Sequence, residues 1–241
     1  MYTYILCLVL LSAYQTNGQG PVVPPGLRPL VGPSGPSGTF VTRDSVVYGT
    51  CYFNNTYSQV KGRVDIRQDL QMNPPNIEMR VQVWGLPQST MSDAEHAMHV
   101  HQWGDTTRGC YNAGPHFDSD AFSVHGGPAS MDRTVRHDGD LGNLRQTNDG
   151  IIDTGFNVQN MMLVGDASIM GRSIVMHEGR DDLGRGNTPV SLQTGNSGAP
   201  IACCVVGLSD STNWNNPLMI NGQFVNRGGM TPLNPNLNML G

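Results

Sequence analysis

The sequence predicts an all-β protein built as a sandwich or barrel of short strands. Two segments, residues 60–68 and 77–84, alternate apolar and polar residues with the period of two expected for a half-buried strand. No segment shows a sustained helical period. Turn-forming sequences separate the short apolar runs at residues 73–75, 148–150 and 187–189. Short strands at this spacing are typical of sandwiches and barrels.

The two ends of the 241-residue chain differ from the middle in composition. Residues 1–18 contain the apolar run Ile5–Leu11 and are predicted to be a secretory signal peptide, cleaved near Gly18 or Gly20; the alternative is a buried N-terminal strand. Residues 19–42 form a predicted Pro/Gly-rich arm, with eleven glycines or prolines between residues 20 and 38. Residues 43–211 are the predicted folded domain. Residues 212–241 form an Asn-rich tail, either disordered or docked on a neighbouring subunit.

The charge pattern excludes several classes of partner. The formal net charge is −5, Lys61 is the single lysine, and no basic run occurs. Nucleic acid and heparin-type matrix require clustered lysine and arginine, so neither is an expected partner. The apolar run near the N-terminus is too short to span a bilayer, so no membrane partner is expected either.

Six of the seven histidines, together with one aspartate, have the spacing of a site for two metal ions. His99 and His101 are two residues apart, so one strand would point both rings to the same face. His177 ends another apolar run. Copper and zinc favour neutral imidazole with a carboxylate to balance charge. The remaining candidates lie in the irregular, Gly/Pro/Asp-rich stretch 109–142, which metal ligation and a disulfide would order: His116, His125, His137 and Asp140.

The sequence around these residues resembles the copper/zinc superoxide dismutases from about Val46 to Asp210. The resemblance rests on Met98-His99-Val100-His101, Gly114-Pro115-His116-Phe117, His125-Gly126-Gly127-Pro128, Gly139-Asp140-Leu141-Gly142-Asn143, His177-Glu178 and Asp181-Asp182-Leu183-Gly184. It implies a Greek-key β-barrel or sandwich of eight strands, with long metal-binding and electrostatic loops. It also implies redox cycling at one copper ion, which dismutes the small substrate superoxide to oxygen and hydrogen peroxide.

The resemblance further implies the two metal sites residue by residue. The copper ligands, which are also the catalytic residues, would be His99, His101, His116 and His177. The zinc ligands would be His116, His125, His137 and Asp140, with His116 shared between the metals. Asp181 would hydrogen-bond His99 and His125 and so fix their orientation. The spans from His116 to His125 and from His125 to His137 are slightly longer than is usual in the family, which a loop can absorb.

Cysteine usage favours an oxidising, extracellular compartment. By the resemblance, Cys110 and Cys203 would form the family's disulfide between loop and barrel. Cys204 must face the other side of its strand, and in the family the strand that contains Cys51 lies beside it. A second bridge, Cys51–Cys204, is therefore expected, with two free buried thiols as the alternative. Asn54 begins a glycosylation sequon in an expected hairpin turn.

One departure from the family bears on catalysis. Three residues before Cys203, where the family has an arginine that attracts the anion, this chain has Pro200. Pro189, Val190 and Gln193 stand where the family often has two acids and a lysine. Such a channel would capture superoxide less efficiently, unless Arg180 or Arg185 substitutes. The sequence therefore predicts a secreted, weakened superoxide dismutase.

The alternative is a non-enzymatic extracellular carrier or defence protein that binds metal on the same fold. The altered channel and the Asn-rich tail look like the superoxide-dismutase-domain plasma proteins of bivalve haemolymph, of the cavortin, dominin and pernin type. Family dimers pair through segments that match residues 103–105, 169–171 and 205–208, which are apolar here, so a homodimer or larger homo-oligomer is expected.

Overall fold

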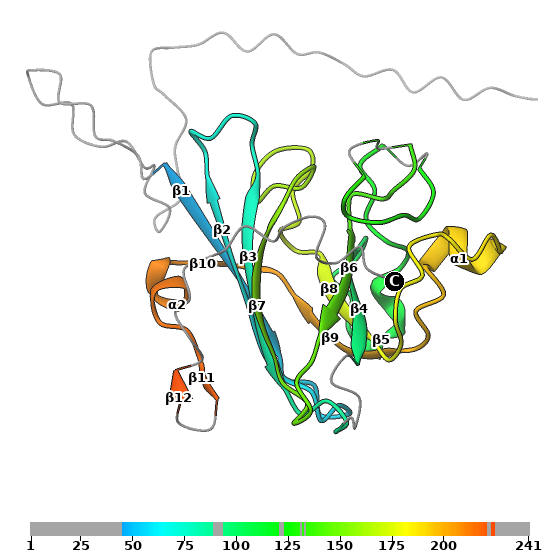
Figure 1. Ribbon diagram of the computed structural model, residues 1–241. Coiled ribbons are helices and arrows are strands. Elements are labelled where there is room, and N and C mark those ends of the chain that lie inside the picture. Colours follow the sequence, from blue (N-terminus) through cyan, green and yellow to red (C-terminus); the bar gives the residue numbers. More distant parts are fainter. Residues whose placement is uncertain are drawn as a thin grey trace, which may run out of the picture. The chain divides into compact units, whose positions relative to one another are not determined.

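Figure 1 shows the two larger antiparallel sheets, and the main hydrophobic cluster contains buried residues of both. This computed structural model describes residues 45–88, 94–120, 123–130, 132, 134–220 and 223–224, so the predicted signal peptide, the N-terminal arm and residues 225–241 lie outside the described residues. The first sheet has the order β10-β1-β2-β3-β7, from Gly207–Ser209, Val46–Phe53, Lys61–Asp69, Ile77–Trp84 and Ile152–Val158. The second has the order β6-β4-β8-β9, from Asp140–Arg145, Glu95–His101, Ser173–His177 and Pro200–Val205.

The predicted all-β fold is confirmed. Only Val206 separates β9 from β10, so the last strand passes from one sheet to the other, and with these two counted as one the sheets contain eight strands. The chain crosses between the sheets from β3 to β4, from β6 to β7 and again from β7 to β8, as in a Greek key. β2 and β3 coincide within one residue with the alternating segments of the sequence, because successive side chains of a strand point to opposite faces. In β2 the polar face is buried as well, at Arg63 and Asp65.

Some local elements were not predicted. Two single-turn helices, α1 (Pro189–Thr194) and α2 (Ser211–Asn215), are too short to produce a periodic pattern in the sequence. The stretch 109–142 was expected to be irregular. Its first residues form the end of β5 (Thr107–Cys110) and a 3-10 turn (Tyr111–Ala113), and its last residues form the start of β6. A short pair, β11 (Met219–Ile220) and β12 (Gln223–Phe224), follows α2. None of the helices in the described part is long and apolar enough to cross a membrane.

Both expected disulfides are present. Cys51 of β1 is bonded to Cys204 of β9, with their Cα atoms 5.4 Å apart. Cys110 at the end of β5 is bonded to Cys203, with a Cα separation of 5.6 Å. Successive residues of a strand face opposite sides, so the adjacent cysteines of β9 reach two different partners. The Cys110–Cys203 bridge ties the start of the histidine-rich loop, which contains His116, His125 and His137, to the barrel.

The first part of the predicted tail lies against the chain's own barrel, which neither alternative for the tail had anticipated. The buried Arg63 of β2 donates to the backbone oxygens of Asn213 and Asn216, at 3.0 and 2.9 Å. Arg80 of β3 donates to Trp214 O at 2.7 Å, and its guanidinium carbon lies 4.6 Å from the centre of the Trp214 ring. These arginines donate to backbone oxygens at and just after α2, because the last carbonyl oxygens of a helix have no N–H donor within the helix.

Candidate metal centre

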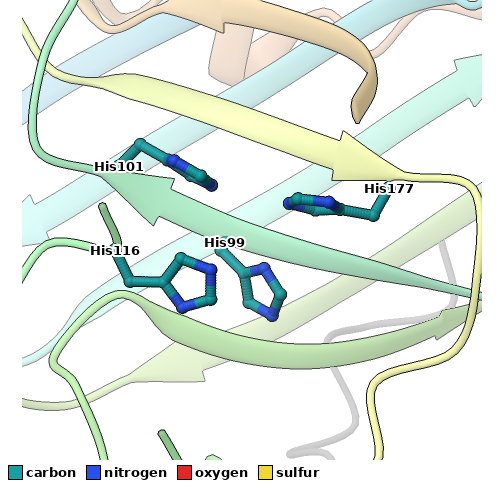
Figure 2. A group of neighbouring side chains, drawn as sticks. All are labelled: His99, His101, His116 and His177. Atoms are coloured by element: carbon teal, nitrogen blue, oxygen red, sulfur yellow. The ribbon is translucent and has the colours of Figure 1, made fainter. Parts of the chain in front are cut away.

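Four histidines from one sheet and its adjoining loop gather around a common space (Figure 2). His99 and His101 both lie on β4, where two-residue spacing places their rings on one face. His177 ends β8, the antiparallel neighbour of β4. His116 follows in the loop and forms an isolated β-bridge with His101. One ligand atom from each ring lies within 4.8 Å of the others.

Each of these rings has one buried nitrogen without a hydrogen-bond partner among the described residues. These atoms are Nδ1 of His99 and Nε2 of His101, His116 and His177. The other nitrogen of each ring is hydrogen-bonded: His99 Nε2 to Asp181 Oδ2 at 3.0 Å, His101 Nδ1 to Gly114 O at 2.8 Å, His116 Nδ1 to Asp140 Oδ1 at 2.8 Å, and His177 Nδ1 to Gly198 O at 3.1 Å.

The chemistry of this set fits a copper ion. Carbonyl and carboxylate oxygens accept hydrogen bonds, so without metal the bonded nitrogens carry the protons and the unpartnered ones carry lone pairs. A zinc ion in the second cluster would have to displace the proton of His116 Nδ1. A buried polar atom left without a partner costs about 1–3 kcal/mol, and four such lone pairs converge here. Four imidazole nitrogens are a ligand set that copper accepts.

Burial keeps these rings neutral, which a metal ligand requires. It lowers the pKa of His101 to about 3 and that of His177 to about 4, and in each case a nearby His116 adds to the effect. Burial also lowers the pKa of His99 well below its ordinary value. At neutral pH the lone pairs are therefore available.

A second cluster is centred on one carboxylate oxygen. Asp140 Oδ1 lies 2.8 Å from Nδ1 of His116, 3.0 Å from Nδ1 of His125 and 3.2 Å from Nδ1 of His137. Three imidazoles and one carboxylate form the closed set that suits tetrahedral zinc. A ring nitrogen of His99 also lies within 4.8 Å of ligand atoms of His116, His125 and Asp140, so the two clusters adjoin.

Asp181 connects the two clusters from behind. Its Oδ2 lies 3.0 Å from His99 Nε2 and its Oδ1 lies 2.7 Å from His125 Nε2, with the carboxylate fully buried. Burial alone would raise the pKa of Asp181, but the hydrogen bonds from His125 and His99 lower it to about 2. Burial alone would lower the pKa of His125, but Asp140 and Asp181 raise it to about 9, so without metal this ring is protonated at neutral pH and zinc would have to displace the proton. Gly195 permits this arrangement, because a Cβ there would lie 1.9 Å from Asp181 Oδ1.

Two supporting residues escaped the sequence analysis. The seventh histidine, His96, is buried, with Nδ1 3.0 Å from His177 O and Nε2 2.8 Å from Gln146 Oε1. Arg136 is buried within the loop and donates to Pro128 O at 2.8 Å and to Asp140 O at 3.2 Å. Because Arg136 donates to backbone oxygens, no sequence pattern indicated this role.

A pocket opens over the first cluster and reaches His101, His116, His137 and His177. Apart from the histidines, the described residues that line it carry no formal charge: Gly114, Pro115, Ser123, Val124, Pro189, Leu192, Gln193, Thr194 and Gly198. Arg180 and Arg185 are not among them. Arg180 Nε instead lies 2.6 Å from Glu95 Oε2.

Pro200 pairs with His177 in the β8–β9 ladder and lies two residues after Gly198, which lines the pocket over the histidines. The Pro200 ring itself lines a neighbouring groove with Tyr57 and Arg108, so only a longer side chain at this position could extend toward the pocket.

The fold and the site define a class of protein: a Greek-key β-sandwich with two adjoining metal-type clusters that share one histidine. Residues 60–206 match the copper/zinc superoxide dismutase family, and the chain belongs to it. The chain is 44% identical over 151 residues to an extracellular superoxide dismutase [Cu-Zn] of Drosophila melanogaster, a match that covers 63% of this chain and 77% of that protein. It is 38% identical over 151 residues to a superoxide dismutase [Cu-Zn] of Saccharomyces cerevisiae, covering 63% of this chain and 92% of the relative. A relative in Schizosaccharomyces pombe is 48% identical over 120 residues, 49% of this chain and 74% of that protein.

Proposed function

We propose that this protein is a secreted, copper- and zinc-binding superoxide dismutase that converts superoxide to oxygen and hydrogen peroxide with reduced efficiency. The four converging, unpartnered histidine nitrogens are the observation that supports it most. Copper would be held by His99, His101, His116 and His177, and zinc by His116, His125, His137 and Asp140. A bound copper ion would supply the one-electron transfers, and a bound zinc ion a fixed charge beside His116.

The chain's own residues would orient the site and handle the proton. Asp181 fixes the ring of His99, and Gly114 O fixes that of His101. His116 has Nδ1 on the Asp140 side, its Nε2 has no partner, and its ring lines the pocket. When it does not ligate copper, Nε2 of His116 would be the atom at which a proton is held and passed to the product.

The reduced efficiency follows from the charge of the pocket. A focused positive field raises the capture rate of a small anion by roughly 10 to 1,000-fold. Here the described lining offers no arginine or lysine, and Arg180 is paired with Glu95 outside it. Superoxide would therefore reach the site by nearly unassisted diffusion.

A second function is supported by the same uncharged pocket. The protein could be a non-enzymatic extracellular carrier or defence protein that keeps copper and zinc, similar to the plasma proteins of bivalve haemolymph. Retention of all the histidines favours the enzyme, whereas Pro200 and the uncharged lining favour the carrier.

Metal analysis of the purified protein together with a superoxide assay separates the two functions. The weakened enzyme should contain both metals, and Pro200→Arg should raise its second-order rate with superoxide. Added salt should reduce this gain, since screening limits an exposed charge to about 8–10 Å near physiological ionic strength. Gln88→Arg adds the same charge at the groove that Pro200 lines and should change little.

His99→Ala should abolish activity in either background. A copper-loaded Pro200→Arg variant that stays inert would support the carrier. A wild-type rate near the diffusional limit would show that the protein is not weakened.

Location and assembly are part of the proposal. We infer a secreted protein from the predicted signal peptide and two disulfides, which persist in oxidising compartments. We also infer a homodimer or larger homo-oligomer, with Trp103 and Leu208, 54% and 75% exposed, within the expected contact segments. The domain proposed for residues 43–211 would extend to Leu218, whose backbone N–H donates to Gln82 Oε1 at 2.8 Å. Asn54 is exposed and is proposed as a glycan acceptor.

A further inference from the structure

The loop between β1 and β2 covers the Cys110–Cys203 disulfide. Tyr57 Oη lies 3.1 Å from Cys110 Sγ and 3.2 Å from Cys203 Sγ, so one hydroxyl contacts both sulfurs. From the same loop, Asn55 Oδ1 accepts a hydrogen bond from Cys203 N at 3.2 Å. The Tyr57 ring covers Gly109, where a Cβ would lie 3.5 Å from Tyr57 Cζ. The loop thus contacts the disulfide through two side chains.

Access to this disulfide is one-sided. Cys203 is fully buried and Cys110 is 5% exposed. The groove that Pro200 lines is also lined by Cys110 and Tyr57 but not by Cys203, so a reductant in this groove meets the Cys110 sulfur beside the Tyr57 hydroxyl. Burial raises the pKa of Tyr57, so the hydroxyl is protonated at neutral pH and can donate to sulfur.

We propose that Tyr57 is a positioning residue that shields the Cys110–Cys203 disulfide from small thiol reductants and thereby keeps the histidine-rich loop attached to the barrel. Reduction would begin when a thiolate attacks Cys110 Sγ and releases Cys203 as a thiolate, leaving a mixed disulfide. A second thiolate would attack the mixed disulfide, release Cys110 as a thiolate and leave as the oxidised small disulfide, a two-electron reduction overall.

The consequence reaches the proposed metal sites. Cys110 lies six residues before His116, so the bridge is the covalent tie nearest to the start of the loop. Its loss would free β5 from β9 and let the loop move. This consequence rests on the proposed metal binding, whereas the shielding itself does not.

The test measures how fast each disulfide opens in the metal-free protein under dithiothreitol, by alkylation of the released thiols and mass spectrometry. Tyr57→Phe keeps the ring over the groove side and removes only the hydroxyl, which would also stabilise the departing Cys203 thiolate, so opening of Cys110–Cys203 should stay within about 2-fold of the wild-type rate or slow slightly. Tyr57→Ala also exposes the Cys110 sulfur to the groove and should speed opening of Cys110–Cys203 about tenfold or more.

Two controls make the result specific. Tyr111→Phe changes a neighbouring tyrosine that is 76% exposed and for which the described residues provide no hydrogen bond, so it should have no effect. The Cys51–Cys204 bridge should open at the wild-type rate in every variant. Unchanged opening of Cys110–Cys203 in Tyr57→Ala would overturn the proposal, as would equal acceleration of both bridges, which indicates general loosening. Because neither metal nor superoxide is used, the result is independent of the proposed function.

Discussion

Replacing Asp181 by asparagine tests how the two clusters are held. Asp181 is fully buried and accepts from His99 Nε2 at 3.0 Å and His125 Nε2 at 2.7 Å. Asparagine has nearly the same shape but only one acceptor oxygen, so its amide N–H₂ would face a ring N–H. One hydrogen bond would be lost outright and the other would lose its charged partner.

The magnitude follows from those two contacts. Hydrogen bonds to charged groups contribute about 1.5–3 kcal/mol each, so Asp181→Asn should lower the free energy of unfolding of the metal-free protein by about 2–4 kcal/mol. Loss of a carboxylate that orients ligand histidines typically lowers metal affinity about 10- to 100-fold. We expect that loss for zinc, because Asp181 orients His125.

The assays are urea unfolding of the metal-free protein and competition for zinc with a chelator. Asp182→Asn is the matched control, because Asp182 Oδ1 accepts from Gly184 N and Ser191 Oγ, at 3.0 and 2.7 Å, and has no hydrogen bond or ion pair with a histidine of the described part. The reasoning is refuted if Asp181→Asn holds zinc as tightly as the wild type, or if Asp182→Asn weakens zinc binding equally.

Three further predictions concern pH, the docked tail and assembly. His101 and His177 have folded pKa values of about 3 and 4, below the unfolded value, so the unfolded chain binds more protons in acid. The metal-free protein should therefore lose about 1.5 kcal/mol of stability per ring as the pH falls from about 6.5 to about 5. Urea unfolding at different pH values that shows no such loss would contradict this. Arg80→Ala removes the contacts to Trp214 and should cost about 1–2 kcal/mol and expose the tail to protease, so an unchanged cleavage rate would argue against docking in solution. Leu208→Asp should convert the expected dimer to monomer in light scattering, whereas a wild-type protein that is monomeric at micromolar concentration would exclude the dimer.

Local patterns in the sequence were sufficient to predict several strands and to select the candidate metal ligands. β2 and β3 follow from alternation, and His99 and His101 share a face because side chains of a strand repeat every two residues. The irregular stretch that holds His116, His125 and His137 was also visible as a loop that needed a reason to be ordered. The resemblance to the family then supplied the pairing of the cysteines, which spacing could not.

Other features depend on contacts between residues far apart in the chain, and no local pattern contains them. Arg180 was a candidate for the channel charge until the fold placed Glu95, 85 residues away, 2.6 Å from it. Tyr57 became a neighbour of Cys203, 146 residues away, only when β1, β2 and β9 came together. The sequence by itself determined which residues can repeat on one face and which chemistry they can offer. Only the packing of the two sheets decided which hydrogen-bond partner each buried polar group found, because burial makes an unpartnered group costly but does not say which partner is near.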